Sequence, residues 1–373
     1  MSFVIESPGR PGLAGEQPAR PLRIGMIAPP WYEVPPRGYG GTEAVVGALV
    51  DQLAERGHEV TLVAAGRAGT KAARTVKVYE EPPSELLGRS AVPEVMAAAV
   101  AARAFAELDL DIIHDHSLAG PLLAFERGIP TVATMHGPTT GENADYFARL
   151  GDAVDLVAIS EAQRRQRPEL NWTGVVHNAI DVASFPYREQ KDGFVLWIGR
   201  FSPDKGAHLA IDAARAAGRR IVLAGKLNEP EERAYFEREV RPRLGDGADY
   251  LGEASAIAKR ELFAGASCLV FPIQWEEPFG MVMVEAMACG TPVVATRRGS
   301  VPEVVADGET GIIVDRVAEL PTAIARAEEL DPAACRRWTE ERFDLPVMAA
   351  GYERIYRGLI EGTNEIRELA SAA

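Results

Sequence analysis

The sequence predicts an α/β protein built from two doubly wound, Rossmann-like domains that face each other across a cleft. Short apolar segments alternate with segments of helical spacing from residue 22 to about residue 314, and this alternation restarts after a polar stretch near residue 190. At 373 residues the chain is also too long for one ordinary hydrophobic core. Parallel sheets covered by helices on both faces place ligands at the carboxyl ends of their strands, so the cleft is the expected site.

The expected elements follow from periodicity and from the Gly and Pro residues that bound each segment. In the first half, strands are expected at 22–28, 59–65, 111–116, 131–136, 155–160 and 174–178, with helices at 44–56 and 95–108. In the second half, strands are expected at 194–199, 220–224, 249–251, 268–273, 293–296 and 311–314, with helices at 206–217, 231–241, 257–265 and 281–289.

The predicted domain boundaries follow changes in composition. Residues 1–21 are rich in Pro, Gly and polar groups and are expected to be a disordered tail, 22–180 form the first domain, and 181–193 (DVASFPYREQKDG) form the linker. Residues 194–345 form the second domain, and 346–373 are expected to be helical.

Composition excludes several classes of partner. The formal net charge is −14 and both halves are acidic, which argues against nucleic acid and against a basic face for anionic lipid. No apolar run approaches the roughly 18 residues of a membrane span, and the N-terminus lacks the apolar core of a signal peptide. The three cysteines (Cys268, Cys289 and Cys335) show no metal or disulfide spacing. We therefore expect a cytoplasmic protein whose cysteines behave as small buried hydrophobes.

The most informative segment is 274–296, QWEEPFGMVMVEAMACGTPVVAT, in which Glu277 and Glu285 bracket seven residues. It predicts a turn at 278–280 followed by a helix whose first N–H groups are open to an anion, because Gly280 precedes them. Acidic residues near a helix start can act as caps, but capping does not explain Glu285 inside an apolar helix. A ribose diol would suit that carboxylate. A glycosidase pair remains an alternative.

A basic loop, IGRFSPDKG, follows the first strand of the second domain. Arg200 and Lys205 are expected at the cleft, where a planar guanidinium and a compact ammonium both suit a diphosphate. The alternative is a pair of solvated surface charges.

In the first domain, Gly40 and Gly41 precede a helix and resemble a phosphate-binding loop, although glycines at such a place also make ordinary turns. His136 ends a strand and is expected to point toward the second domain. A strand-end histidine bonded only to backbone is the alternative.

Two further patterns could indicate a metal. His114, Asp115 and His116 end a neighbouring strand, but adjacent residues of a strand alternate faces, so only His116 is expected at the cleft. The Asp109–Asp111 pair matches a DxD pattern of metal-using sugar transferases. It precedes a first-domain strand, so solvated charges at a helix end are the stronger interpretation.

Together these segments resemble the retaining GT-B glycosyltransferases of family four. The resemblance covers roughly residues 22–314 and includes the two-glutamate segment, IGRFSPDKG, the Gly-Gly loop, the histidine at 136 and HNAIDVASF at 177–185. The long first loop, PPWYEVPPRGYGG, departs from the pattern near the acceptor side, where Tyr39 and His116 are candidate acceptor contacts.

The resemblance implies a role for each matching position. Glu285 would hold the ribose, Glu277 and His136 the sugar hydroxyls, and Arg200 and Lys205 the diphosphate. The donor would also contact Gly40, Gly41, Phe279, Gly280 and Met281. The resemblance implies no metal and no cofactor, and a final helix that crosses back onto the first domain.

The expected activity is transfer of a hexosyl group, with retention, from a nucleoside-diphosphate sugar to a hydroxyl acceptor. A phosphorylase, hydrolase or epimerase acting on a nucleotide sugar is the alternative, as is a non-catalytic protein that binds the sugar nucleotide. A nicotinamide-dependent oxidoreductase fits less well, because GxGxxG follows neither domain's first strand.

Overall fold

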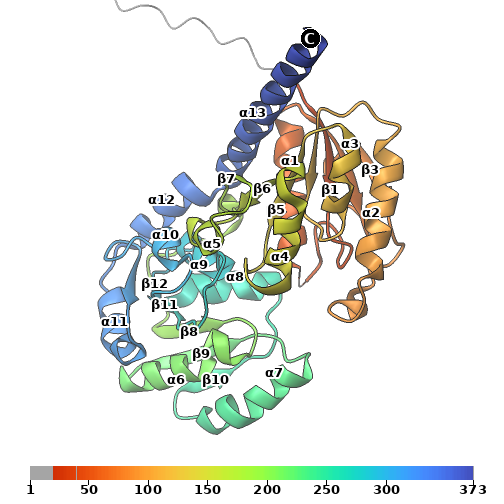
Figure 1. Ribbon diagram of the computed structural model, residues 1–373. Helices are drawn as coiled ribbons and strands as arrows, with labels where there is room; N and C mark the ends of the chain where they lie inside the picture. The colour runs from red at the N-terminus through yellow and green to blue at the C-terminus, as the bar shows by residue number, and fades with distance from the viewer. Residues whose placement is uncertain (1–19, 39, 373) are drawn as a thin grey trace, which may run out of the picture.

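The computed structural model describes residues 20–38 and 40–372, with side chains as far as Thr363. Over these residues the chain forms two α/β domains, each with one parallel sheet between layers of helices (Figure 1). The predicted fold class is therefore confirmed. Residues 1–19 of the expected tail, and Tyr39 of the expected acceptor side, lie outside the described residues.

The first domain contains a seven-stranded sheet in the order β3-β2-β1-β4-β5-β6-β7. Its central strands are buried on both faces, which explains their continuous apolar sequences. The strands are β1 (Arg23–Ile27), β2 (Glu59–Ala64), β3 (Arg74–Lys77), β4 (Ile112–Asp115), β5 (Thr131–Met135), β6 (Asp155–Ala158) and β7 (Trp172–Val175). The helices are α1 (Gly41–Glu55), η1 (Ser84–Leu86), α2 (Val92–Phe105), η2 (Gly120–Leu123), α3 (Ala124–Arg127), α4 (Gly141–Leu150), η3 (Gly151–Ala153) and α5 (Glu161–Gln166).

The second domain contains a six-stranded sheet in the order β10-β9-β8-β11-β12-β13. The strands are β8 (Phe194–Ile198), β9 (Arg220–Ala224), β10 (Ala248–Tyr250), β11 (Ala266–Phe271), β12 (Val293–Thr296) and β13 (Gly311–Val314). The helices are α6 (Ala207–Ala216), α7 (Pro230–Tyr235), the π-helix η6 (Phe236–Val240), α8 (Ala256–Gly265), α9 (Met281–Ala288), α10 (Val301–Val304) and α11 (Leu320–Ala327). Short 3-10 turns are η4 (Val182–Ser184), η5 (Pro203–Lys205), η7 (Arg241–Arg243) and η8 (Val317–Glu319).

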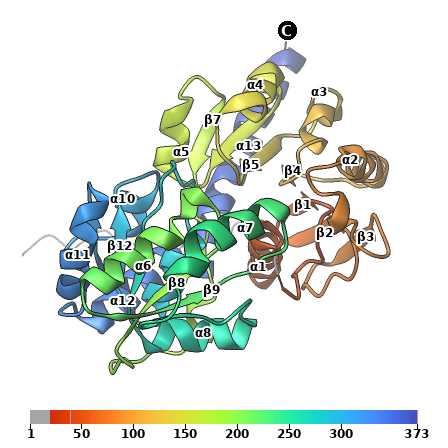
Figure 2. The same ribbon diagram turned by 90° about the horizontal axis from the view of Figure 1, so that it is seen from below.

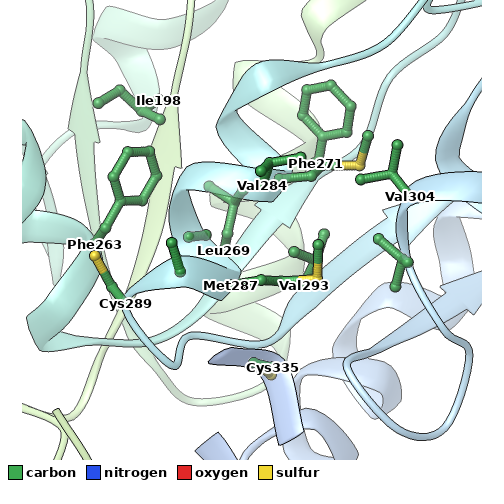
Figure 3. Packing of buried hydrophobic residues seen from close by; sticks show 14 of the residues in the cluster. Ile198, Phe263, Leu269, Phe271, Val284, Met287, Cys289, Val293, Val304 and Cys335 are labelled. Atoms are coloured by element: carbon green, nitrogen blue, oxygen red, sulfur yellow. The ribbon is translucent and has the colours of Figure 1, made fainter. Parts of the chain in front are cut away.

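Helix α9 lies in the core of the second domain. Val284 and Met287 pack with Leu269 of β11 and Val293 of β12, and all four are fully buried (Figure 3). Cys289 and Cys335 belong to the same cluster, and all three cysteines of the chain are free and buried. The cysteines are therefore packing residues, as predicted.

The chain ends with two helices that return to the first domain. Helix α12 (Pro332–Phe343) packs against α9, and α13 (Leu345–Ala372) packs along α1. Tyr352 and Tyr356 of α13 are fully buried in the apolar cluster of the first domain. The predicted helix that crosses back is therefore confirmed, and Figure 1 shows it beside α1.

The two segments that connect the domains are bonded to each other. The backbone N–H of Ile180, just before η4, donates to the carbonyl of Phe343 at 3.0 Å. The N–H of Val182 donates to the carboxylate of Asp344 at 3.2 Å. The linker and the start of α13 therefore pass between the domains as a pair.

In each sheet the order of the strands reverses at one place, and these two places locate the cleft. In the first sheet the chain moves outward from β1 on one side and from β4 on the other; in the second sheet β8 and β11 have these positions. Ligands of doubly wound sheets bind outside the carboxyl ends of such strands. The loops after these four strands are therefore the ones that build the site.

Candidate active site

A cavity of about 410 Å³ opens at the carboxyl edge of the first sheet. Its walls come from the loops after β1, β4 and β5, from the loop at Leu87, and from helices α1, α2 and α4, all in the first domain. Polar lining residues include Gly40, Gly41, Glu43, Glu94, His116, His136 and Asn143. Apolar ones include Trp31, Leu87, Leu118 and Phe147. The two glycines and the two histidines expected at the cleft thus line one cavity.

His116, which is buried, and His136, which is half-buried, form a pair on the wall of this cavity. The Nδ1 atom of His116 lies 2.8 Å from Nε2 of His136, so one nitrogen donates and the other accepts. Burial lowers the pKa of His136 to about 4, and burial also holds the pKa of His116 well below its ordinary value. Both rings are therefore neutral at pH 7. A neutral ring at this position can orient a hydroxyl without adding charge.

His114 lies on the same side of the strand as His116, as alternation along a strand requires, and the centres of the two rings are 4.0 Å apart. Its Nδ1 lies 2.6 Å from the hydroxyl of Tyr356 and its Nε2 lies 2.8 Å from the hydroxyl of Thr134. Between the two histidines, Asp115 accepts from the backbone N–H and the hydroxyl of Ser117, at 2.9 and 2.7 Å. Asp115 therefore bonds to the turn that follows the strand, whereas the two histidine rings lie against each other.

Both carboxylates of the Asp109–Asp111 pair contact arginines, and only Asp109 is also exposed to solvent, as expected. Asp111 binds Arg20 at 2.9 Å and Arg23 at 3.2 Å, and Asp109 also contacts Arg23. Although burial opposes it, hydrogen bonding to Arg20 and Arg23 lowers the pKa of Asp111 to about 2. The expectation of solvated charges was wrong for Asp111, whose side chain is 8% exposed.

Two carboxylates lie on the polar side of the cavity. Glu94 of α2 accepts from the indole Nε1 of Trp31 at 2.7 Å and from the backbone N–H of Leu118 at 2.9 Å. Glu43, in the first turn of α1, is 3% exposed, and burial raises its pKa to about 7. Sequence reasoning missed both residues, because a Glu near a helix start is also an ordinary capping residue.

In the second domain, the loops after β8 and β11 meet. The ammonium of Lys205 forms an ion pair with Oε2 of Glu277, and the indole Nε1 of Trp275 donates to the same oxygen at 3.0 Å. The ammonium also lies 5.0 Å from the centre of the Trp275 ring, within the range of a cation–π contact. The structure thus pairs one residue of the predicted basic loop with one of the two predicted glutamates. Arg200, at the other end of the basic loop, is exposed.

The turn before α9 begins the helix close to the first domain. Gly280 has a φ of +77°, which favours glycine, and it precedes the first helical residue, Met281. Phe279 is buried, and its carbonyl accepts from the hydroxyl of Ser300 at 2.7 Å. Met281 packs against the apolar clusters of both domains, so the N-terminus of α9 lies where the domains meet.

Glu285 lies one turn into α9 and has a partner that sequence reasoning missed. The ammonium of Lys259, on α8, is 2.6 Å from Oε1 of Glu285. The other oxygen, Oε2, is buried and without a hydrogen-bond partner. No spacing in the sequence connects these two residues, because they lie on different helices. A buried acceptor that is unsatisfied in the protein suits a ligand hydroxyl.

A carboxylate also joins the two domains beside this site. Glu303 of α10 accepts from the backbone N–H groups of Glu161 and Ala162 at 2.7 and 2.5 Å, and it lies 3.4 Å from Nε2 of His177. Although burial opposes it, these hydrogen bonds lower the pKa of Glu303. Figure 1 shows α5 and α10 next to each other at this contact.

Comparisons with known families agree with this architecture. Residues 39–184 match the family described as Glycosyltransferase Family 4, and residues 182–342 match the family described as Glycosyl transferases group 1. Over residues 20–38 and 40–372, none of the helices combines the length and apolar composition needed to cross a bilayer.

Individual relatives are similar over nearly the whole chain. A phosphatidyl-myo-inositol mannosyltransferase of Mycolicibacterium smegmatis is 30% identical, with 90% of this chain and 93% of that protein covered. A glycogen synthase of Mycobacterium tuberculosis is 26% identical, with 92% and 96% covered. The crystal structure of a glycosyltransferase involved in avilamycin A biosynthesis has a TM-score of 0.71 and 29% identity, with 92% and 99% covered. The chain therefore belongs to the group 1 glycosyltransferases of the family-four type, and it is a glycosyltransferase of GT-B fold.

Proposed function

We propose that the protein transfers a hexosyl group, with retention of anomeric configuration, from a nucleoside-diphosphate sugar to a hydroxyl acceptor. The observation that carries the proposal is the arrangement around α9. An ion pair between Lys205 and Glu277 lies at its N-terminal turn, and the half-satisfied Glu285 lies one turn inside. Among the relatives, the name of the mannosyltransferase supports a hexosyl donor.

In this proposal the second domain binds the nucleotide. The unpartnered Oε2 of Glu285 accepts hydrogen bonds from the ribose diol, while Lys259 holds the other oxygen in place. The N–H groups at the start of α9, after Gly280, face the diphosphate and favour its negative charge. Arg200 and Lys205 balance the charge that develops as the nucleoside diphosphate leaves, so the proposal includes no metal.

The sugar lies between the domains in this proposal. Glu277 accepts from its hydroxyls on one side, and the neutral ring of His136 binds a hydroxyl on the other. Gly40 and Gly41 complete the diphosphate contacts from the first domain. The acceptor hydroxyl enters from the first-domain cavity and attacks the anomeric carbon on the face that the leaving group vacates. The proposal assigns no side chain as a covalent nucleophile.

Replacing Lys205 and Glu285 by Ala, one at a time, tests the donor site. Removal of one preorganised charge partner lowers kcat by about 100- to 1000-fold, so either variant should lose most turnover. Release of nucleoside diphosphate is measured over a panel of uridine, guanosine and adenosine diphosphate sugars, with circular dichroism as a check of folding. Lys77→Ala, an exposed lysine on β3, is the matched control.

Product analysis tests the reaction. Proton NMR of the glycoside gives the anomeric configuration, and an inverted product would contradict retention. Release of free sugar in the absence of an acceptor would favour a hydrolase, and a sugar phosphate formed with inorganic phosphate would favour a phosphorylase. Unchanged turnover in Lys205→Ala and Glu285→Ala would refute the donor site itself.

A further inference from the structure

The large hydrophobic side chains exposed on this protein are concentrated in one region. Eight of the twelve that are exposed in the described part of the chain lie between residues 86 and 125. They belong to η1 and the loop after it, to the start of α2, and to the η2–α3 segment with the loop before it. We call the exposed apolar side chains of residues 86–96 and 118–125 the apolar rim. Figures 1 and 2 show α2 and α3 on the outer flank of the first domain, away from the second domain.

The rim residues lie on adjoining segments of the first domain. Val92, Val95 and Met96 are spaced so that they share one face of α2, and they are 64%, 58% and 44% exposed. The carboxylate of Glu94 binds the backbone N–H of Leu118 at 2.9 Å, which fixes the 118–125 segment against the start of α2. Phe125, on α3, is 63% exposed. Large apolar side chains exposed together on adjoining segments indicate a candidate interaction site.

The rim is continuous with the first-domain cavity. Leu87 and Leu118 are both exposed members of the rim and both line the cavity. Glu94 lines the same cavity and is buried. A molecule in the cavity would therefore meet hydrogen-bonding groups around His136 and Glu43 at the inner end, and apolar side chains where it leaves.

Charge distinguishes among possible occupants of the rim. Residues 84–127 contain seven Asp or Glu against three Arg and no Lys. Adsorption on an anionic bilayer relies on clustered Lys and Arg, which this segment lacks. Continuity with the cavity favours an occupant that enters the active site over one that covers only the outer surface.

We propose that the acceptor is amphipathic: its hydroxyl-bearing end enters the first-domain cavity, and an uncharged apolar arm lies along the apolar rim. This inference rests on the proposed function, because it names the substrate class of the same site. Binding of the apolar arm alone requires no sugar donor, so it can be measured separately from turnover.

The test uses methyl, butyl and octyl β-D-glucosides as probes, below the micelle-forming concentration of the octyl compound. Dissociation constants and the ligand protons in contact are measured by saturation-transfer NMR without any donor. Each methylene that leaves water tightens binding by up to about fourfold, so the octyl compound should bind wild type at least about tenfold more tightly than the methyl compound. Its alkyl protons should receive saturation.

The variants locate that gain on the rim. Val95→Glu/Met96→Glu should abolish the dependence on chain length while leaving methyl glucoside binding unchanged, and Val95→Ser/Met96→Ser should reduce it without adding charge. Ile257→Glu, at an apolar residue of α8 that is 75% exposed, is the control and should bind all three probes as wild type does. No dependence on chain length in wild type, or an equal loss in Ile257→Glu, would overturn the proposal.

Two further experiments test whether the apolar rim binds something other than an acceptor. Co-sedimentation of wild type with phosphatidylcholine vesicles, abolished in Val95→Glu/Met96→Glu, would assign the rim to a membrane and overturn the proposal. A dimer in analytical ultracentrifugation that this variant dissociates would assign the rim to a second copy, with the same consequence. Release of nucleoside diphosphate is recorded in parallel, so failure of the donor site is seen independently of the chain-length result.

Discussion

Replacing His136 by Asn should make the protein more resistant to acid than the wild type. His136 is half-buried, its ring is bonded to His116 at 2.8 Å, and desolvation lowers its pKa to about 4 from an ordinary value of 6.5. Asn keeps a polar side chain of similar reach but has no titrating proton. The difference in unfolding free energy between the two proteins therefore isolates the titration of this ring.

The sign follows from proton uptake. Well above pH 6.5 neither state binds the proton, so the free energy of unfolding does not depend on this group. Below that pH the unfolded chain takes up a proton that the folded chain accepts only near pH 4, so the wild type loses stability as the pH falls. Between pH 7 and pH 5 this loss is about 2 kcal/mol for one ring, and His136→Asn escapes it. The charged form of His136 also opposes protonation of His116, so removing His136 acts in the same direction.

Urea unfolding followed by circular dichroism at pH 7, 6 and 5 gives the two free energies. Asn143→Ala, in the wall of the same cavity, is the control and should differ from wild type by an amount that does not change with pH. A constant difference between wild type and His136→Asn over this range would refute the assignment of a neutral His136 ring with a lowered pKa. A difference that grows in favour of wild type would show that the ring gains a proton on folding.

Three further predictions concern the second domain. Gly299→Ala, at a φ of +50°, would place a Cβ against the backbone of Glu277. Donor binding, measured by thermal-shift titration, should therefore weaken by about tenfold or more, and wild-type affinity would contradict the close approach. Glu303→Gln should cost about 1–2 kcal/mol in urea unfolding at pH 7. Because the folded pKa of Glu303 is lowered, that cost should be present above the ordinary pKa of 4.5 and disappear as the pH falls through the folded value; a cost that persists in acid would contradict it. Lys259→Met should lower the free energy of unfolding by about 1–2 kcal/mol, because Glu285 then has neither oxygen paired. Glu285→Gln in the same chain should recover part of this loss, and additive effects of the two substitutions on the free energy of unfolding would show that the pair is not coupled.

Most strands could be predicted because parallel strands buried on both faces have uninterrupted apolar sequences. The exception is β3, Arg74–Lys77, which was missed. Three of its four residues are exposed, and only Val76 packs toward the core, so its sequence carries neither an apolar run nor an alternating pattern. The strand exists because β2 offers it a free edge, which is tertiary information. Helix α4 was missed for a related reason, since only three of its ten residues are buried.

Site residues could be predicted where the sequence of their own loop indicates their role. Lys205 and Glu277 follow neighbouring strands of the second sheet, so the sheet order alone brings their loops together, and the structure pairs them. Lys259 and Glu303 could not be found in this way. Each acts through a partner on another helix or another domain, and nothing local in their sequences distinguishes them from solvated charges.

The paired passage of the chain between the domains restricts how the enzyme can close. The first connecting segment is hydrogen bonded to the second through Ile180 and Val182, which bind Phe343 and Asp344. Neither segment can therefore move without the other. Two tethers fixed side by side act as a pivot: they permit the lobes to rotate about a line through that point and resist translation apart. The donor and the acceptor then gain access when the domains rotate about this point and open the cleft at its opposite end. An insertion into either connecting segment would uncouple that rotation.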